Sequence, residues 1–148
     1  MKETFGSDFK QYYNGDPEKI PEANMPCLVV EMLSDRTELG QTNEDDVVEQ
    51  IRVKAIFNKK DDFSNDADPI NVTHKRLRAV IGARDEDTGE YLKKTIKGAL
   101  RQKMSAGNLI VSHDMTVDLG IQFREGEVVT AEGHVTVAVG YSVNIVEE

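Results

Sequence analysis

Apolar and polar side chains alternate in two stretches near the C-terminus. In residues 115–123 every second side chain is apolar. In residues 135–145 apolar or aromatic side chains, mainly valines, alternate with small or polar residues. Successive side chains of a strand point to opposite faces, so each stretch is predicted to be a strand with one buried face. The polar break at 124–126 is short, which predicts that the two strands pair as antiparallel neighbours.

Two more strands are predicted earlier in the chain. Residues 27–33 form an apolar run that follows Pro26, and this run is typical of a strand buried on both faces. Residues 49–58 alternate, with the apolar side chains facing inward. The polar, acidic residues 34–46 between them are predicted to be a loop or a hairpin tip. Residues 1–25 carry turn signals and prolines and are predicted to be irregular.

Helical spacing of apolar residues follows in residues 70–83 and again in residues 90–106. In the second stretch Leu92, Ile96, Leu100 and Met104 recur every four residues, and Gly107 is a typical helix stop. Burial of each such side chain on the sheet stabilises by roughly 1.5–3 kcal/mol. We therefore expect an α+β fold with two layers, in which two helices pack on one face of an antiparallel or mixed sheet of at least four strands. The expected organisation is a single domain, 1–148, with an irregular segment 1–25 and an α/β core 26–148.

Charge is distributed unevenly along the chain. The 148 residues include 27 acidic and 18 basic side chains, a net charge of −9, which argues against a protein whose main task is to grip nucleic acid. Residues 74–104 reverse the balance, with nine Lys or Arg against four Asp or Glu. This basic stretch suits either docking to other copies or charged partners, or a solvated helix face.

The single cysteine and the absence of long apolar runs indicate in which kind of cellular compartment the protein is expected. Cys27 has no cysteine partner within the chain, so a reducing compartment is expected, with Cys27 as a small buried side chain. We expect no membrane span and no secretion signal.

Sequence motifs for chemistry are lacking. Ser112, His113 and Asp114 are adjacent on an extended stretch, so their side chains cannot bond in series as a catalytic triad. The Asp-rich segment 59–68 lacks the glycine and glutamate of an EF-hand loop, and the three histidines are scattered. We expect no enzymatic activity, no cofactor and no metal. Gly120 and Gly140, inside strands, predict bulges or a close approach of backbone.

Three stretches together carry a family resemblance. They are YYNGDPEKIPEANMPCLVVE at 12–31, IRVKAIFNKKDDF at 51–63 and KRLRAVIGARDEDTGEYLKKTIKGALR at 75–101. In this order they resemble tail terminator proteins of tailed bacteriophages, which are also called tail completion or minor tail proteins. The resemblance implies a virion protein that forms a hexameric ring, caps the tail tube, stops its polymerisation and joins it to the head connector. It also implies that DNA passes through the lumen without specific binding.

The resemblance places the protein at the head-proximal end of the tail, after assembly in the host cytoplasm. The polar outer faces of the strands are candidate subunit contacts, and Tyr12 and Tyr13 are either a further contact or a cover for the core edge. The strand residues in this candidate interface are Arg52, Lys54, Asp118, Gln122 and Arg124.

Two alternatives remain open at this point. One is a head–tail connector or neck protein, with a similar size and ring habit. The other is a monomeric ligand-binding or enzymatic α+β domain with a pocket that gathers His113, His134 and the Asp-rich segment.

Overall fold

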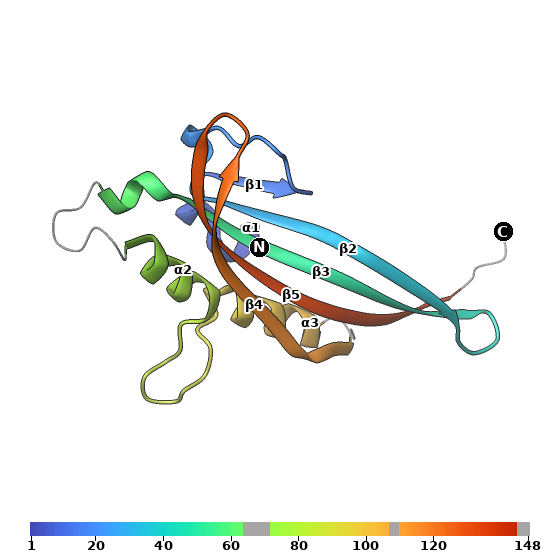
Figure 1. The fold of residues 1–148 in the computed structure, drawn as a ribbon. Helices are drawn as coiled ribbons and strands as arrows, with labels where there is room; N and C mark the ends of the chain where they lie inside the picture. Colours follow the sequence, from blue (N-terminus) through green and yellow to red (C-terminus); the bar gives the residue numbers. More distant parts are fainter. Residues whose placement is uncertain (64–71, 107–109, 145–148) are drawn as a thin grey trace.

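A computed structural model describes residues 1–63, 72–106 and 110–144, and it confirms the α+β architecture (Figure 1). Within these ranges, five strands form one mixed sheet in the order β1-β2-β3-β5-β4, in which only the β1–β2 pair is parallel. The strands are β1 Gln11–Asn14, β2 Cys27–Leu39, β3 Glu44–Asn58, β4 Ile110–Arg124 and β5 Val128–Asn144. The longer helices are α2 Val72–Gly82 and α3 Ile96–Ala106, and the short ones are α1 Lys2–Phe5, η1 Gly6–Asp8, η2 Glu22–Asn24 and η3 Lys59–Phe63.

The predicted C-terminal hairpin is present as β4 and β5. The two strands pair antiparallel, and the pairs Val117↔Val135 and Met115↔Val137 put the expected apolar side chains on one face. β5 starts at Val128, seven residues before the predicted start, and β4 extends to Arg124. The turn between the two strands spans residues 125–127, one residue later than the predicted polar break at 124–126, and both Gly126 and Glu127 in it have positive φ.

The hairpin of β2 and β3 is longer than the sequence predicts. The acidic stretch 34–46 was expected to be a loop or a hairpin tip. Only residues 40–43 turn, and Asn43 occupies the left-handed region that this tight connection requires. Polar residues of β2 form a strand here because each pairs with β3, which in turn pairs with β5. Thr37, Val47 and Tyr141, for example, lie side by side across the three strands. The predicted hairpin tip is therefore confirmed at residues 40–43, and the alternative of a loop across all of 34–46 is wrong.

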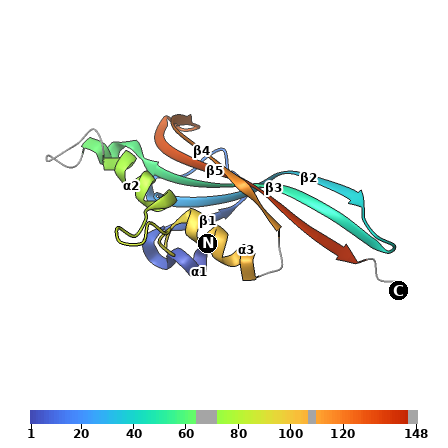
Figure 2. The ribbon, with the colours of Figure 1, turned by 90° about the horizontal axis from the view of Figure 1, so that it is seen from below.

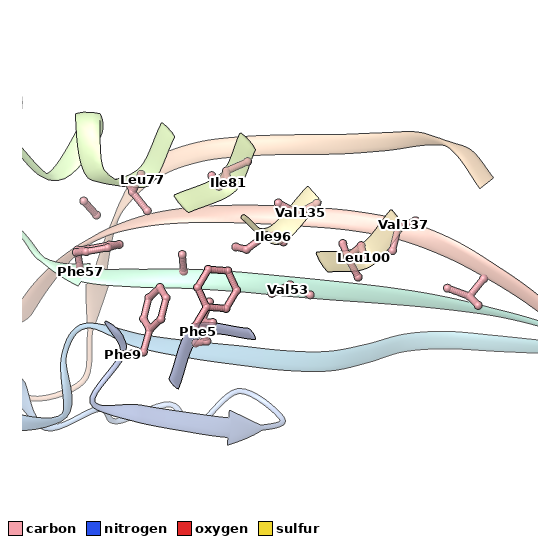
Figure 3. Packing of buried hydrophobic residues seen from close by; sticks show 14 residues of the cluster. Phe5, Phe9, Val53, Phe57, Leu77, Ile81, Ile96, Leu100, Val135 and Val137 are labelled. Atoms are coloured by element: carbon pink, nitrogen blue, oxygen red, sulfur yellow. The ribbon is translucent and has the colours of Figure 1, made fainter. Parts of the chain in front are cut away.

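The N-terminal segment is also more ordered than predicted. It contains the short strand β1, which pairs with the start of β2, together with α1, η1 and η2. Phe5 and Phe9 pack edge to face with ring centroids 5.4 Å apart, and Phe9 also contacts Phe57 at 6.1 Å. These aromatic contacts fix the segment against the core (Figure 3).

The second helix is shorter than its apolar spacing predicts. α3 begins at Ile96, because Thr95 caps its first turn by accepting a hydrogen bond from the Gly98 backbone at 3.0 Å. Leu92 precedes the helix and is 43 % exposed, so its expected burial was wrong. The first helix is described from Val72 to Gly82, and positions 70 and 71 of its predicted span lie outside the described residues.

The main core lies between the sheet and the helices (Figure 3). Leu77 and Ile81 of α2 and Ile96 and Leu100 of α3 meet the apolar face of the central strands. The strand residues of this core are Leu28, Val53, Ala55, Phe57, Ala131, Val135, Val137 and Val139.

Close packing at a strand glycine occurs at Gly133, where the neighbouring atoms belong to side chains and not to backbone. A Cβ at Gly133 would lie 2.4 Å from Cδ1 of Ile81 and 3.0 Å from Cδ2 of Leu119, so these side chains would have to shift. Gly120 pairs regularly with Glu132, and a Cβ on Gly120 would meet nothing within 4 Å. The register shifts of the sheet lie elsewhere, between Met32 and Ser34 and between Val111 and Met115.

Three strands continue past the helical layer (Figure 2). We call this extension the arm, and it consists of residues 31–50 with residues 139–144 of β5. Most arm side chains are partly or fully exposed, whereas the same strands are buried where the helices cover them.

Candidate functional site

Buried charges gather on the face of the sheet opposite the helices. We call this group the outer-face ion cluster, and it consists of Asp16, Glu31, Lys54, Arg124, Glu132 and His134. Strands β2, β3, β4 and β5 each supply members, because alternation sends their even or odd positions to this face while their apolar neighbours enter the core. Asp16 comes instead from the segment after β1.

Glu132 is the centre of the cluster, and only 1 % of its surface is exposed. Its Oε1 accepts from Arg124 Nε at 2.6 Å and from the Thr130 hydroxyl at 2.8 Å. Its Oε2 lies 2.7 Å from His134 Nε2. Both carboxylate oxygens are thus satisfied, as a buried charge requires.

Asp16 links the N-terminal segment to this centre. Its carboxylate accepts from Lys54 Nζ at 2.6 Å and from Arg124 at 2.9 Å, and Arg124 also donates to the Pro17 carbonyl at 3.1 Å. Lys54, only 7 % exposed, has a second carboxylate partner in Glu31 at 2.9 Å. The cluster therefore fixes the chain around Asp16 to the outer face.

Ion pairing shifts the pKa values in the direction that keeps these groups charged. Burial by itself raises the pKa of Glu132, but hydrogen bonds from His134, Arg124 and Thr130 outweigh burial and lower the pKa to about 2. Burial likewise acts to raise the pKa of Asp16, and hydrogen bonds from Arg124 and Lys54 lower it overall. For Arg124, burial acts to lower the pKa, and Glu132 and Asp16 raise it overall.

A cleft of about 380 Å³ opens beside the cluster. Its lining comprises Asp16, Glu18, Lys54, Gln122, Phe123, Arg124, Glu125, Glu132 and His134. A histidine held by a carboxylate is one part of a hydrolase triad, but these lining residues include no serine, threonine or cysteine to act as nucleophile. The carboxylates of Asp16 and Glu132 already pair with cations of the same chain. The role that fits this arrangement best is to attach the N-terminal segment to the sheet.

An apolar cap lies next to the ion cluster on the same face. Ile20 and Met25 cover Cys27, Val29 and Ile56, and all five are almost fully buried. Cys27 is buried as predicted, and desolvation raises the pKa of its thiol to about 12, so the thiol is unreactive at neutral pH.

The candidate interface residues occupy different environments. Lys54 and Arg124 are inside the ion cluster, whereas Asp118 and Gln122 are exposed on β4. Arg52 is partly exposed and donates to the Thr136 hydroxyl at 3.2 Å. The structure brings these residues to one face, as the alternation predicts, and their role in subunit contact stays a prediction.

The two tyrosines lie at the edge of the core. The Tyr12 hydroxyl donates to the Gly6 carbonyl at 2.8 Å, and the Tyr13 hydroxyl accepts from the Asn24 side chain at 2.9 Å. Each is partly buried against one of the two apolar clusters, so both cover the core edge.

The pocket expected for a ligand-binding domain is only partly assembled. His134 lines the outer-face cleft, but Asp61 and Asp62 do not. Asp62 instead pairs with Lys59 and accepts from the Thr73 backbone at 2.7 Å, which caps the first turn of α2. His74 is exposed on α2, and the side chain of His113 lies outside the described residues.

Among the described residues, most of the exposed large apolar side chains lie on two surfaces. One is on the free edge strand β4, where Phe123 is 85 % exposed beside Leu119 and Ile121. The other is the arm, where the exposed residues are Met32, Leu33, Leu39, Val48 and Val143. Sequence alternation could not distinguish these exposed positions from buried ones, since both look alike along the chain.

A groove of about 500 Å³ lies on the helical face. Phe5, Phe9 and Phe57 form part of its floor, and Arg76 and Lys94 stand at its border. The other lining residues are Asp8, Pro26, Ala79, Val80, Ala83, Leu92 and Thr95. The groove is bordered by α2 and the segment before α3, and its lining is mainly apolar.

Comparisons with known proteins add no family assignment. No protein-family model matches this chain, and a search of curated proteins finds no match. Within the described ranges, no group of three or more acidic, histidine or cysteine side chains is arranged to hold a metal ion. The helices in those ranges are all too short or too polar to cross a membrane.

Proposed function

We propose that the protein is a structural subunit of a tailed-phage virion, a tail terminator that forms a ring on the end of the tail tube. The ring stops polymerisation of the tube and joins it to the head connector. The observation that carries the proposal is the arm, which extends a well-paired sheet beyond the body and exposes apolar side chains such as Leu39. Exposed apolar surface on an ordered element is typical of assembly surfaces.

The free edges of the sheet support the same proposal. β4 is an edge strand with three exposed apolar side chains, and β2 beyond residue 30 lacks β1 as a neighbour. These surfaces lie toward different parts of the molecule, so contact between unlike surfaces of successive copies is geometrically available. Such heterologous contacts build rings when the rotation closes.

The net negative charge of the chain supports the proposal that DNA passes through the lumen of the ring. The net charge of −9 gives a ring that repels phosphates and lets DNA slide through its lumen. The most buried cations, Lys54 and Arg124, already hold carboxylates within the chain, so they do not offer a phosphate-binding surface.

Light scattering combined with negative-stain images tests the proposal. Rings of several subunits that bind the ends of purified tail tubes and block further growth are the expected result. Rings that bind the portal side instead would assign the protein to the neck. A monomer that neither binds tube ends nor blocks their growth would contradict the proposal.

A matched variant controls for nonspecific loss of activity. Glu86→Lys with Asp87→Lys changes exposed residues of the loop after α2, outside both the arm and the groove. This variant should form rings and cap tubes as the unmodified protein does.

A further inference from the structure

The arm and the helical layer have opposite charge. Residues 31–50 of the arm hold seven Asp or Glu and one basic residue, Arg36, which already pairs with Glu38. On the helical side, residues 72–84 and 91–102 together hold eight Lys or Arg and no acidic residue. The two surfaces belong to different ends of one molecule, because the arm runs away from the helices (Figure 2).

The end of the arm presents an apolar row interrupted by one acid. Leu39, Asp45 and Val143 lie side by side across β2, β3 and β5, on the face that carries the core residues further along the sheet. Leu39 is 82 % exposed and Val143 is also exposed. Two backbone hydrogen bonds close the turn. The Gly40 N–H donates to the Glu44 carbonyl at 3.0 Å, and the Glu44 N–H donates to the Gln41 carbonyl at 3.0 Å. The row is therefore presented by an ordered turn, which lowers the entropic cost of docking.

The groove on the helical face has the complementary properties. Its floor is aromatic and aliphatic, Leu92 is exposed on it, and Arg76 and Lys94 stand at its border. These two cations contact Asp61 at 3.6 Å and Asp8 at 2.6 Å within the chain. Both contacts are solvent exposed, and exposed pairs are weak and exchange readily, so the cations can turn toward an incoming carboxylate.

We propose that the acidic arm of one copy docks in the basic-bordered groove of the next copy, with Leu39 in the groove and Asp45 facing Arg76 and Lys94. The occupant is a second copy of this chain, since the chain itself contains both complementary surfaces. The contact joins unlike surfaces, so repeated contacts generate a closed ring or an open filament. This inference rests on the proposed function, to which it adds the subunit interface.

Reciprocal charge reversal tests the contact. The arm-reversed variant is Glu44→Lys with Asp45→Lys, and the groove-reversed variant is Arg76→Glu with Lys94→Glu. Each variant alone brings like charges together and should lose assembly, measured as mass by light scattering. An equimolar mixture should recover assembly, because each reversed surface then meets its complement on the other variant. The Glu86→Lys, Asp87→Lys variant carries a matched charge change outside both surfaces and should assemble normally.

Disulfide crosslinking gives a second measurement that does not require stable rings. Cys27 is buried and unreactive, so new thiols report on their own contacts. A chain carrying Leu39→Cys and Ala79→Cys should give a ladder of trimers and larger species when oxidised with copper phenanthroline. Each single-cysteine variant can give no species beyond a dimer. Leu39→Ser should weaken association roughly ten- to hundred-fold, as expected for loss of one buried leucine from the contact.

The outcomes separate this inference from the proposed function. Rings that form without the ladder, or that survive both charge reversals, would overturn the inference and leave the proposed function standing. A ladder without rings on tube ends would support the contact and count against the terminator. A monomer with neither ladder nor tube binding would overturn both. Rings that lose only tube binding on arm reversal would assign the arm to the tube and also overturn the inference.

Discussion

The helical face and the outer face of the same sheet are covered by different interactions. On the helical face, Val53, Val135 and Val137 are buried by apolar packing in the cluster that includes side chains of α2 and α3. On the outer face, the N-terminal segment is attached partly by apolar contacts and partly by the ion pairs of Asp16. The stability of the helical layer depends on the apolar area removed from water. The attachment of the N-terminal segment also depends on ion pairs whose partners must both be present. The two faces should therefore respond differently to mutation and to pH.

A charge placed in the helical-face core should have the largest effect. Ile96 is fully buried, so Ile96→Asp leaves an unpaired carboxylate among apolar side chains and should lower the free energy of unfolding by at least about 5 kcal/mol. Leu92→Asp, four residues earlier, should change it by less than about 1 kcal/mol, because Leu92 lies outside α3 and is exposed. Circular dichroism during chemical denaturation measures both. Equal losses would show that the helix includes Leu92.

The pair Leu92 and Ile96 also shows how far sequence reasoning reaches. Apolar spacing correctly predicted α2, most of α3 and the four long strands, because regular burial leaves a periodic trace. It included Leu92 in the helix because spacing does not report where a helix starts. Thr95 was the available signal, as threonine is a common N-cap, and its bond to Gly98 confirms that role.

No periodic pattern in the sequence predicts the outer-face ion cluster. Arg124 and Asp16 are 108 positions apart, and their partnership depends on the order of strands in the sheet. The alternation did place Lys54 and Arg124 on the polar face, but it could not show that carboxylates of the same chain already hold them. β1 was missed for a related reason, since four residues form a strand here only because β2 pairs with them.

Removing the central cation of the outer face should have the next largest effect. Arg124→Met leaves Glu132 buried without its arginine partner and should cost about 3–5 kcal/mol of unfolding free energy. Gln122→Met, two residues earlier on the same face of β4 and exposed, should be nearly neutral. The double variant Arg124→Met with Glu132→Met should recover part of the loss, because no uncompensated carboxylate remains at position 132. Chemical denaturation compares the three variants, and an unchanged Arg124→Met would contradict a stabilising role for the cluster.

Acid should weaken the outer face selectively. The pKa of Glu132 is lowered to about 2 in the folded protein, below its ordinary value, so its contribution is present above about pH 4.5 and is lost as pH falls toward 2. A shift of this size corresponds to a loss on the order of 3 kcal/mol. Glu132→Gln should flatten the dependence of unfolding free energy on pH between 5 and 2. Ile96→Val, on the helical face, should lower stability at every pH and keep the slope of the unmodified protein.

Leu39→Ser should have the smallest effect on folding. Leu39 projects from the arm and contacts neither cover of the sheet, so its loss should change the free energy of unfolding by less than about 0.5 kcal/mol. The same substitution should weaken association between copies, which light scattering at several concentrations measures. A variant that folds normally and assembles poorly would separate the arm from both faces of the body. A variant that unfolds would instead show that Leu39 stabilises the monomer, and the arm would then be part of the fold rather than a surface for assembly.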